Sequence, residues 1–397
     1  MNYMKYFFIL GTNTTLSVAE LAAVLDLKNV KLLASDFLVW ETAYEINPEA
    51  LIKRLGGIIK IGEIKEEELR GSEKDLFPVI TQLASVKKYQ CQEGKFNFGF
   101  SDYGKYQFNK KDLGLKLKKY FSDEKISSRF VISHEKNLSS VVITQNKLIT
   151  RGIEIVLVKD TDKILVGETL SVQPFKDLSR RDYGRPARDD ESGMLPPKLA
   201  QIMINLAQEK NMDELVIDPF CGSGTILSEA MLVGYKNLFG SDISLKAIDD
   251  THKNISWIRE LYAIKDVKIK ILVKNVVALS KFIKADSVGA VITEPFLGPQ
   301  RGLIEFKKVS QNIEELYSLA IREFRTVLKK GGRVVMIWPL FYGQKPITPR
   351  YEGFRLINMI PSELRHNEFI KKNDRETIVY GRHGQRVYRE IVVLEKV

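Results

Sequence analysis

The C-terminal half of the chain is organised around Val216-Ile217-Asp218-Pro219-Phe220-Cys221-Gly222-Ser223-Gly224-Thr225. This stretch reads as a buried strand that ends in a carboxylate, followed by a tight turn and the start of a helix. Gly222 and Gly224 let the backbone approach a ligand closely, and Asp218 can accept a hydrogen bond from an ammonium or hydroxyl group. No Gly-Lys-Ser or Gly-Lys-Thr closes the turn, so it is not a phosphate-binding P-loop.

Strands and helices alternate on both sides of this turn. Such alternation is typical of a parallel, doubly wound sheet with helices on both faces. We therefore expect an α/β, Rossmann-like domain over residues 195–397. The expected helices and strands lie, in turn, at residues 197–208, 215–217, 226–233, 237–240, 312–328 and 333–337.

Two further strand ends carry side chains suited to a nucleotide-like ligand. Gly240-Ser241-Asp242-Ile243 ends the strand after the glycine turn, where a carboxylate can accept from both hydroxyls of a ribose. Lys274-Asn275-Val276-Val277-Ala278 ends the third strand, and Asn275 can meet the edge of a base. A surface carboxylate and a turn asparagine are the simpler alternatives at these two places.

The fourth strand ends in Val291-Ile292-Thr293-Glu294-Pro295-Phe296-Leu297-Gly298. An acidic side chain followed by proline and an aromatic residue offers a hydrogen-bond acceptor next to a stacking surface. A plain turn at the end of a strand is the alternative interpretation.

These motifs together resemble a known enzyme class. The string Asp-Pro-Phe-Cys-Gly-Ser-Gly-Thr resembles the cofactor turn of class I methyltransferases, which implies S-adenosyl-L-methionine as the cofactor. In amino-directed members the fourth strand ends in Asp/Asn-Pro-Pro-Tyr/Phe, which implies catalytic roles for Glu294, Pro295 and Phe296. The cofactor-binding residues implied by the resemblance are Asp218, Phe220, Cys221, Gly222, Gly224, Thr225, Asp242, Ile243, Asn275 and Val276.

The chain departs from that pattern at the acceptor. Glu294 stands where the class has Asp or Asn, and Phe296-Leu297 replaces Pro-Tyr. The extra methylene of glutamate moves the acceptor by about 1.5 Å, roughly one bond length, and such a shift lowers the rate unless the backbone compensates. Asn275 also stands where Asp is usual. A non-catalytic RNA-binding protein with a drifted methyltransferase site is therefore an alternative.

The composition indicates a polyanionic partner. The 397 residues carry a formal net charge of +11, with a pI of about 9.3, which favours nucleic acid. Residues 112–121 predict an amphipathic helix with Leu113 and Leu117 on its apolar face. Its lysines either contact phosphates or only form a solvated face. These candidate RNA-binding lysines are Lys116, Lys118 and Lys119.

Nearly the whole chain resembles the tRNA guanosine N2-methyltransferases that carry a THUMP domain and act on the guanosine at position 10. The matching segments lie at residues 10–21, 129–148 and 181–200. The resemblance implies methyl transfer to the exocyclic N2 of a guanosine in tRNA, with DNA amino-methylation as the alternative. It divides the chain into a ferredoxin-like segment (1–60), a THUMP-like RNA-binding domain (61–172), a linker (173–194) and the methyltransferase domain (195–397). A small activator subunit is a further partner to expect.

Four arginines outside the lysine-rich helix are also candidates for RNA contact. Arg181 and Arg185 lie in the charge-dense linker. Arg382 and Arg386 lie in a tail whose pattern predicts a hairpin over residues 375–390, suited to clamping a flipped-out guanine or its phosphates. A solvent-facing turn is the alternative for the tail.

The remaining signals concern location and local structure. Two distant cysteines predict no disulfide framework and a cytoplasmic protein, and the scattered histidines predict no metal site. Phe7-Phe8-Ile9-Leu10 is too short to cross a membrane and lacks a signal-peptide cleavage site. We also expect Ser17 to cap a helix with Glu20 as its capping-box partner, and a strand at Val141–Ile143.

Overall fold

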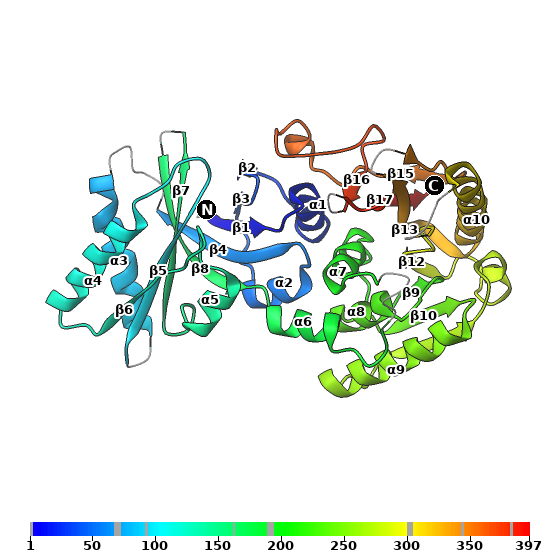
Figure 1. Cartoon of the computed structure of the whole chain (residues 1–397), viewed down its shortest axis with the longest axis horizontal. Coiled ribbons are helices and arrows are strands. Elements are labelled where there is room, and N and C mark those ends of the chain that lie inside the picture. The colour runs from blue at the N-terminus through cyan, green and yellow to red at the C-terminus, as the bar shows by residue number, and fades with distance from the viewer. Residues whose placement is uncertain are drawn as a thin grey trace. The chain divides into compact units, whose positions relative to one another are not determined.

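The computed structural model describes residues 3–66, 73–91, 94–161, 163–188, 194–299, 305–342, 345–381 and 384–397. The chain divides into two compact units (Figure 1). Unit 1 comprises Met1–Ser17, Leu27–Lys176 and Pro361–Ile370. Unit 2 comprises Val18–Asp26, Asp177–Ile360 and Lys371–Val397.

Unit 1 is built on a mixed sheet. Within its described residues the sheet has eight strands in the order β2-β3-β1-β4-β8-β7-β5-β6. Strand β4 runs across the predicted boundary at residue 60, so both predicted N-terminal segments contribute to one sheet. The elements are β1 (Met4–Leu10), β2 (Val30–Ala34), β3 (Phe37–Thr42), α2 (Pro48–Arg54), β4 (Ile58–Glu66), α3 (Glu73–Gln90), β5 (Phe96–Tyr103), α4 (Lys110–Asp123), β6 (Ser128–Val131), α5 (Ser140–Gln145), β7 (Gly152–Asp160) and β8 (Lys163–Val172). Helix α1 (Thr14–Val24) begins in unit 1, and its residues from Val18 onward belong to unit 2.

The core of unit 1 lies on both faces of this sheet. Successive strand residues point to opposite faces, and β7 is apolar at consecutive positions. Ile155 and Leu157 belong to a buried cluster with helices α3 and α4. Val156 belongs to a second cluster, with Phe7 and Phe37 stacked at 5.3 Å between ring centroids. Strand β5 is likewise buried at consecutive positions from Phe98 to Tyr103, so both β5 and β7 are covered on both faces of the sheet.

A buried ion pair crosses the centre of this sheet and leads to a stability prediction. The Lys60 ammonium lies 2.6 Å from Glu154 Oε1, and the two side chains are 2% and 0% exposed. Lys60→Met would leave the Glu154 charge buried without its cation, so we expect the free energy of unfolding to fall by about 3–5 kcal/mol. Urea denaturation followed by circular dichroism measures this loss.

Lys65 provides a matched control for Lys60 on the same strand. It pairs with Glu63 at 2.5 Å, but its side chain is 34% exposed. Lys65→Met is expected to lower the free energy of unfolding by less than about 1 kcal/mol, because water screens the pair. Equal losses for the two variants would contradict the prediction.

Unit 2 contains the expected α/β architecture. Its sheet runs in the order β11-β10-β9-β12-β13-β17-β15; the first five strands are parallel, and β17 is antiparallel to β13. Figure 1 shows helices α7 and α8 on one side of the sheet and α10 on the other. The elements are α6 (Phe175–Tyr183), α7 (Pro197–Leu206), β9 (Leu215–Asp218), α8 (Thr225–Val233), β10 (Asn237–Asp242), α9 (Leu245–Tyr262), β11 (Lys268–Val273), η1 (Val276–Lys281), β12 (Val288–Thr293), α10 (Phe306–Val327), β13 (Leu328–Phe341), β14 (Lys345–Pro346), β15 (Phe354–Leu356), β16 (Ile378–Tyr380) and β17 (Val387–Lys396), while η2 (Ser362–Leu364) belongs to unit 1.

The strand order of unit 2 determines where a ligand can bind. From β9 the chain adds β10 and β11 on one side, then returns to add β12 and β13 on the other. Open parallel sheets bind ligands at such a reversal, beyond the carboxyl ends of the strands. Asp218 and Asp242 end β9 and β10, and Glu294 follows β12. The topology therefore places all three carboxylates at one edge of the sheet.

Several local predictions are wrong. Helix α1 begins at Thr14, where Asn13 Oδ1 accepts from the Leu16 amide at 3.0 Å, and Ser17 lies inside the helix. The Ser17 hydroxyl instead donates to the Gly57 carbonyl at 2.8 Å. Residues Val141–Ile143 form part of helix α5 and not a strand.

The segment predicted as a linker, residues 173–194, contains helix α6, and its residues 189–193 lie outside the described part of the chain. The four-part division of the chain stays a prediction. Among the described helices, none has both the length and the apolar composition needed to span a membrane.

Candidate active site

The glycine turn after β9 has the backbone that its sequence predicts. Gly222 and Gly224 have φ of 51° and 82°, in the left-handed region that favours glycine. A Cβ added at Gly222 would meet no atom within 4 Å, so this residue faces open space. A Cβ at Gly224 would lie 2.8 Å from the Thr251 side chain. Gly222 therefore presents backbone to a ligand, and Gly224 allows helix α9 to pack closely.

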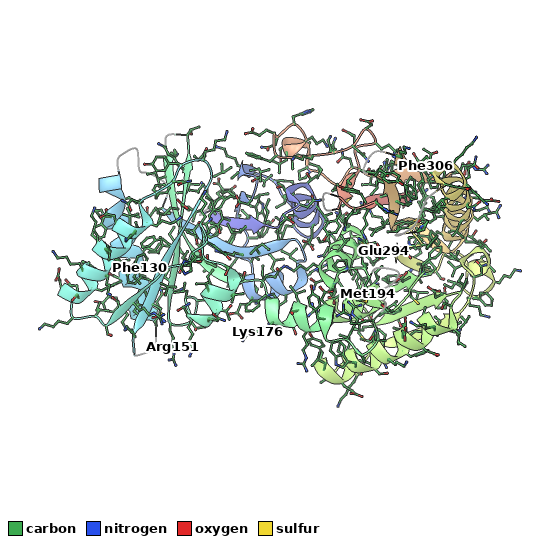
Figure 2. The ribbon with its side chains drawn as sticks, viewed as in Figure 1. Phe130, Arg151, Lys176, Met194, Glu294 and Phe306 are labelled. Carbon is green, nitrogen blue, oxygen red and sulfur yellow. The ribbon has the colours of Figure 1, made fainter. Side chains whose placement is uncertain are left out.

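One cavity of about 730 Å³ lies over the turn and the adjoining strand ends. Its lining includes every predicted cofactor-binding residue except Gly224, and all three predicted catalytic residues. Figure 2 labels Glu294, beyond β12, and Met194, ahead of α7, which both line it. The lining residues outside the motifs quoted for the site are Met194, Leu195, Ile226, Ser244, Lys246, Ala247, Asp250, Pro299 and Leu316.

Asp218 is a desolvated carboxylate in the wall of this cavity. Its residue is 2% exposed, and Oδ1 accepts from the Thr293 hydroxyl at 2.7 Å and from the Phe220 amide at 3.3 Å. Burial is the main cause that raises the pKa of Asp218 to about 7; the nearby Asp242 and Glu294 carboxylates add to the rise, and the two hydrogen bonds oppose it. A cationic ligand group would stabilise the ionised form, so the site suits an ammonium.

Asp242 and Asn275 hold the neighbouring loops in place. Asp242 Oδ2 accepts from the Gly222 amide at 3.1 Å, and its Oδ1 accepts from the Ser244 amide at 2.9 Å. Asn275 Oδ1 accepts from the Val277 amide at 3.1 Å, which caps η1. The NH2 of Asn275 is then the group that can face a ligand. Asp242 and Asn275 therefore suit a nucleoside-like group. Ile243 lines the same cavity and is 73% exposed, so it offers an apolar contact beside them.

The acceptor segment after β12 is fixed by two side chains from elsewhere in unit 2. Arg389 Nε donates to Glu294 Oε1 at 2.6 Å, and the two side chains are 16% and 13% exposed. The Tyr317 hydroxyl donates to the Phe296 carbonyl at 3.0 Å. Burial raises the pKa of Glu294, and the Arg389 guanidinium opposes that rise. Phe296 itself is 61% exposed, so its ring is free to stack with a ligand.

Sequence reasoning missed Arg389, Tyr317 and Thr293. Arg389 lies 95 residues beyond Glu294 on another strand, and no spacing connects them. Tyr317 sits on the buried face of α10, where its apolar neighbours make it resemble an ordinary core residue. Thr293 was part of the quoted motif, and its position one residue before Glu294 was the available signal.

The predicted RNA-binding residues belong to both units. Lys118 and Lys119 are exposed on α4 of unit 1, and Lys116 beside them pairs with Asp112 at 2.6 Å. In the tail, strands β16 and β17 form the expected antiparallel hairpin. The Arg386 carbonyl accepts from the Tyr342 amide at 2.6 Å, and Arg382 lies outside the described residues.

Arg181 and Arg185 are buried in unit 2, at 5% and 7% exposure. Arg181 Nε donates to Glu229 Oε1 at 2.7 Å, and Arg185 Nη1 donates to Thr225 Oγ1 at 2.7 Å. Both bonds end on α8, directly after the glycine turn. This burial argues against the RNA contacts predicted for the two arginines, and it indicates that they support the cofactor turn from behind.

Two family models match parts of the chain. One is described as an RMKL-like methyltransferase domain and matches residues 185–341, which include the glycine turn and Glu294. The other is described as a DNA methylase and matches residues 84–253, so it ends before the acceptor segment.

Curated relatives and solved structures place the chain more closely. A tRNA (guanine(10)-N2)-dimethyltransferase of Methanocaldococcus jannaschii is 26% identical over 66% of this chain and 71% of its own length. TrmN from Thermus thermophilus has the same fold, with a TM-score of 0.56 and 17% identity over 100% of both chains. A protein of Methanothermococcus thermolithotrophicus, named "Probable tRNA (guanine(10)-N2)-dimethyltransferase", is 32% identical over 35% of this chain and 77% of its own length. The chain therefore belongs to the tRNA (guanine(10)-N2)-dimethyltransferase family.

Proposed function

We propose that this protein transfers a methyl group from S-adenosyl-L-methionine to the exocyclic N2 of guanosine 10 in tRNA. The observation that carries the proposal is that the cavity of about 730 Å³ is lined both by the glycine turn and by Glu294-Pro295-Phe296. Cavities of about 300–1,000 Å³ are typical of ligand sites, and this one joins the predicted cofactor residues to the predicted acceptor residues.

Some of the lining residues suit the cofactor, and others suit the target amine. The bound cofactor supplies a methyl group on a sulfonium, which is already a good leaving group. Asp218 and Asp242 offer carboxylates for an ammonium and a ribose, and Gly222 offers backbone. Glu294 and the Pro295 carbonyl accept from the two N–H groups of the target amine. Held in this way, the nitrogen lone pair points out of conjugation with the ring, so positioning and electrostatics supply most of the rate.

The target base has to leave its stack to reach this cavity. The Phe296 ring is exposed at the cavity wall and gives the extruded guanine a stacking surface. We propose that unit 1, which contains the THUMP-like segment, grips the tRNA through exposed lysines such as Lys118 and Lys119 of α4. We also propose a cytoplasmic location, which the two distant cysteines favour, and a small activator subunit, which the resemblance to the THUMP-domain family implies.

The function is tested by methyl incorporation from labelled cofactor into unmodified tRNA, with mass spectrometry of the digested nucleosides. We expect N2-methylated guanosine, and we expect tRNA with adenosine at position 10 to take up none. Duplex DNA is the parallel substrate. Label in DNA alone would support the DNA amino-methyltransferase, and cofactor and RNA binding without label in either would support the non-catalytic alternative.

A further inference from the structure

Glu294 is held by an arginine that is not part of the cavity lining. Arg389 is on β17, opposite Pro339 of β13, and β13 lies beside β12, the strand that leads to Glu294. Its guanidinium therefore crosses β13 to reach the carboxylate, with Nε 2.6 Å from Oε1. Glu294 lines the cavity and Arg389 does not. The arginine thus acts on the acceptor and not directly on a ligand.

We propose that Arg389 is a positioning residue that fixes the Glu294 carboxylate through Oε1 and leaves Oε2 to accept from the target amine. The proposal rests on the function proposed above and adds a residue to it. It also accounts for glutamate at a place where the class has aspartate or asparagine, because the longer side chain is the one that reaches the arginine.

The geometry explains why the two residues depend on each other. A glutamate side chain has one more rotatable bond than aspartate and loses more conformational freedom when it is fixed. The bond from Arg389 restricts that freedom. Aspartate at position 294 would withdraw the carboxylate by about 1.5 Å, beyond hydrogen-bond reach of Nε unless the backbone moved. The arginine and the extra methylene therefore work as a pair.

The strand that carries Arg389 is itself firmly anchored. Glu390, the next residue, points to the opposite face and is fully buried. Arg375 donates to Glu390 Oε2 at 2.6 Å, and the Thr377 hydroxyl donates to Glu390 Oε1 at 2.5 Å. Strand β17 is also paired with β13 along nine residues, so the backbone at Arg389 is held rigidly. A rigid support is what a positioning residue requires.

The Arg389–Glu294 pair also affects the pKa of Glu294. The titratable groups that act on Glu294 or respond to it are Arg389, Asp218 and Tyr317. Arg389 is the cation among them, and it opposes the rise in the pKa of Glu294 that burial causes. Loss of Arg389 should therefore raise that pKa, and the acidic limb of the rate–pH profile should move to higher pH.

The test compares Arg389→Gln, Arg389→Lys and Glu294→Asp in the full-length protein. We expect Arg389→Gln to lower kcat by about 10- to 100-fold, with the affinity for S-adenosylhomocysteine unchanged within about twofold. The acidic limb should shift to higher pH, and Arg389→Lys should recover part of the rate. Glu294→Asp should also lose activity, and adding Arg389→Gln to it should change little further. The control is Arg355→Gln, which breaks an exposed arginine–glutamate pair to Glu395 on the same strand.

A binding measurement gives a readout that needs no turnover. The protein saturated with S-adenosylhomocysteine is titrated with tRNA that has guanosine or inosine at position 10, since inosine lacks the 2-amino group. We expect the wild type to favour guanosine about tenfold or more, and Arg389→Gln to lose most of this preference.

The outcomes separate the two proposals. Unchanged kcat and unchanged guanosine preference in Arg389→Gln would overturn the positioning role, while methylation of tRNA by the wild type would still stand. Full or raised activity of Glu294→Asp would overturn it as well. A wild type that labels no tRNA and does not distinguish guanosine from inosine would overturn both proposals.

Discussion

Glu294→Ala is expected to lower kcat for methyl transfer by about 10²- to 10³-fold, the largest loss of rate among the changes considered. The substitution removes one of the two acceptors that hold the target amine and leaves the Pro295 carbonyl as the other. Because Glu294 lies beyond the glycine turn, the affinity for S-adenosylhomocysteine should stay within about threefold of the wild type. Single-turnover methylation of tRNA and calorimetric binding of S-adenosylhomocysteine measure the two effects separately.

Glu294→Gln separates charge from hydrogen bonding. An amide keeps an acceptor oxygen of the right length but gives Arg389 no anion, so kcat should fall between those of the wild type and Glu294→Ala. The control Asp286→Ala removes a carboxylate from an exposed pair with Lys396 in the same unit, and it should leave kcat unchanged. A Glu294→Ala protein with kcat within about tenfold of the wild type would show that this carboxylate does not hold the amine.

The parts of the site that follow parallel strands could be predicted from the sequence. Each buried strand is a short apolar run, and the residue at its end is polar and sits before a turn. Asp218, Asp242 and Glu294 are all of this kind, and the parallel order of the sheet brings the three strand ends together. The local pattern and the topology agree, so the position of these three carboxylates in the cavity lining follows from strand order.

Contacts between distant segments could not be predicted in this way. Arg389 and Glu294 are 95 residues apart, and Arg181 and Glu229 are 48 apart. A charge-dense segment such as that around Arg181 resembles a solvated linker until its partner on another helix is known. Pairing across the sheet and across helices is set by tertiary packing, which a single sequence does not show.

The wrong local predictions have local causes. The β-branched run Val141–Ile143 favours a strand, but the Ser139 hydroxyl accepts from the Val142 amide at 3.4 Å and starts a short helix there. At the N-terminus, two residues could cap the helix. Asn13 is used as the cap, and Ser17 bonds to Gly57 instead. In both cases a competing side-chain hydrogen bond decided the outcome.

Asp218→Asn is expected to change cofactor affinity and protein stability in opposite directions. Asparagine keeps an acceptor oxygen for the Thr293 hydroxyl and the Phe220 amide but removes the buried charge. An ammonium of the cofactor would lose a charge-assisted bond, so the affinity for S-adenosylhomocysteine should fall by about 10- to 100-fold. Without ligand, the variant should unfold at a higher urea concentration than the wild type at pH 8, because it avoids a desolvated carboxylate.

The pH dependence follows from the same group. The folded pKa of Asp218 is about 7, above the ordinary value of 3.8, so its stabilising contribution is present in full below pH 4 and is lost as the pH rises through 7. The stability advantage of Asp218→Asn should therefore grow between pH 4 and 8. Cofactor affinity should behave in the opposite way. Binding of an ammonium requires the ionised carboxyl, so the wild-type affinity should fall by up to about tenfold per pH unit below 7, while that of Asp218→Asn stays flat.

Asp250→Asn is the matched control for Asp218→Asn, because Asp250 lines the same cavity but pairs with Lys246 at 2.8 Å. It should reproduce neither the pH dependence nor the gain in stability. A wild-type affinity that does not change between pH 6 and 8 would show that Asp218 meets a hydroxyl and not an ammonium, because a neutral donor gives the ionised carboxyl no charge to pair with. The turn at Gly222 would then bind the cofactor without a buried ion pair. In that case Asp218→Asn would lower the affinity for S-adenosylhomocysteine by far less than the expected 10- to 100-fold.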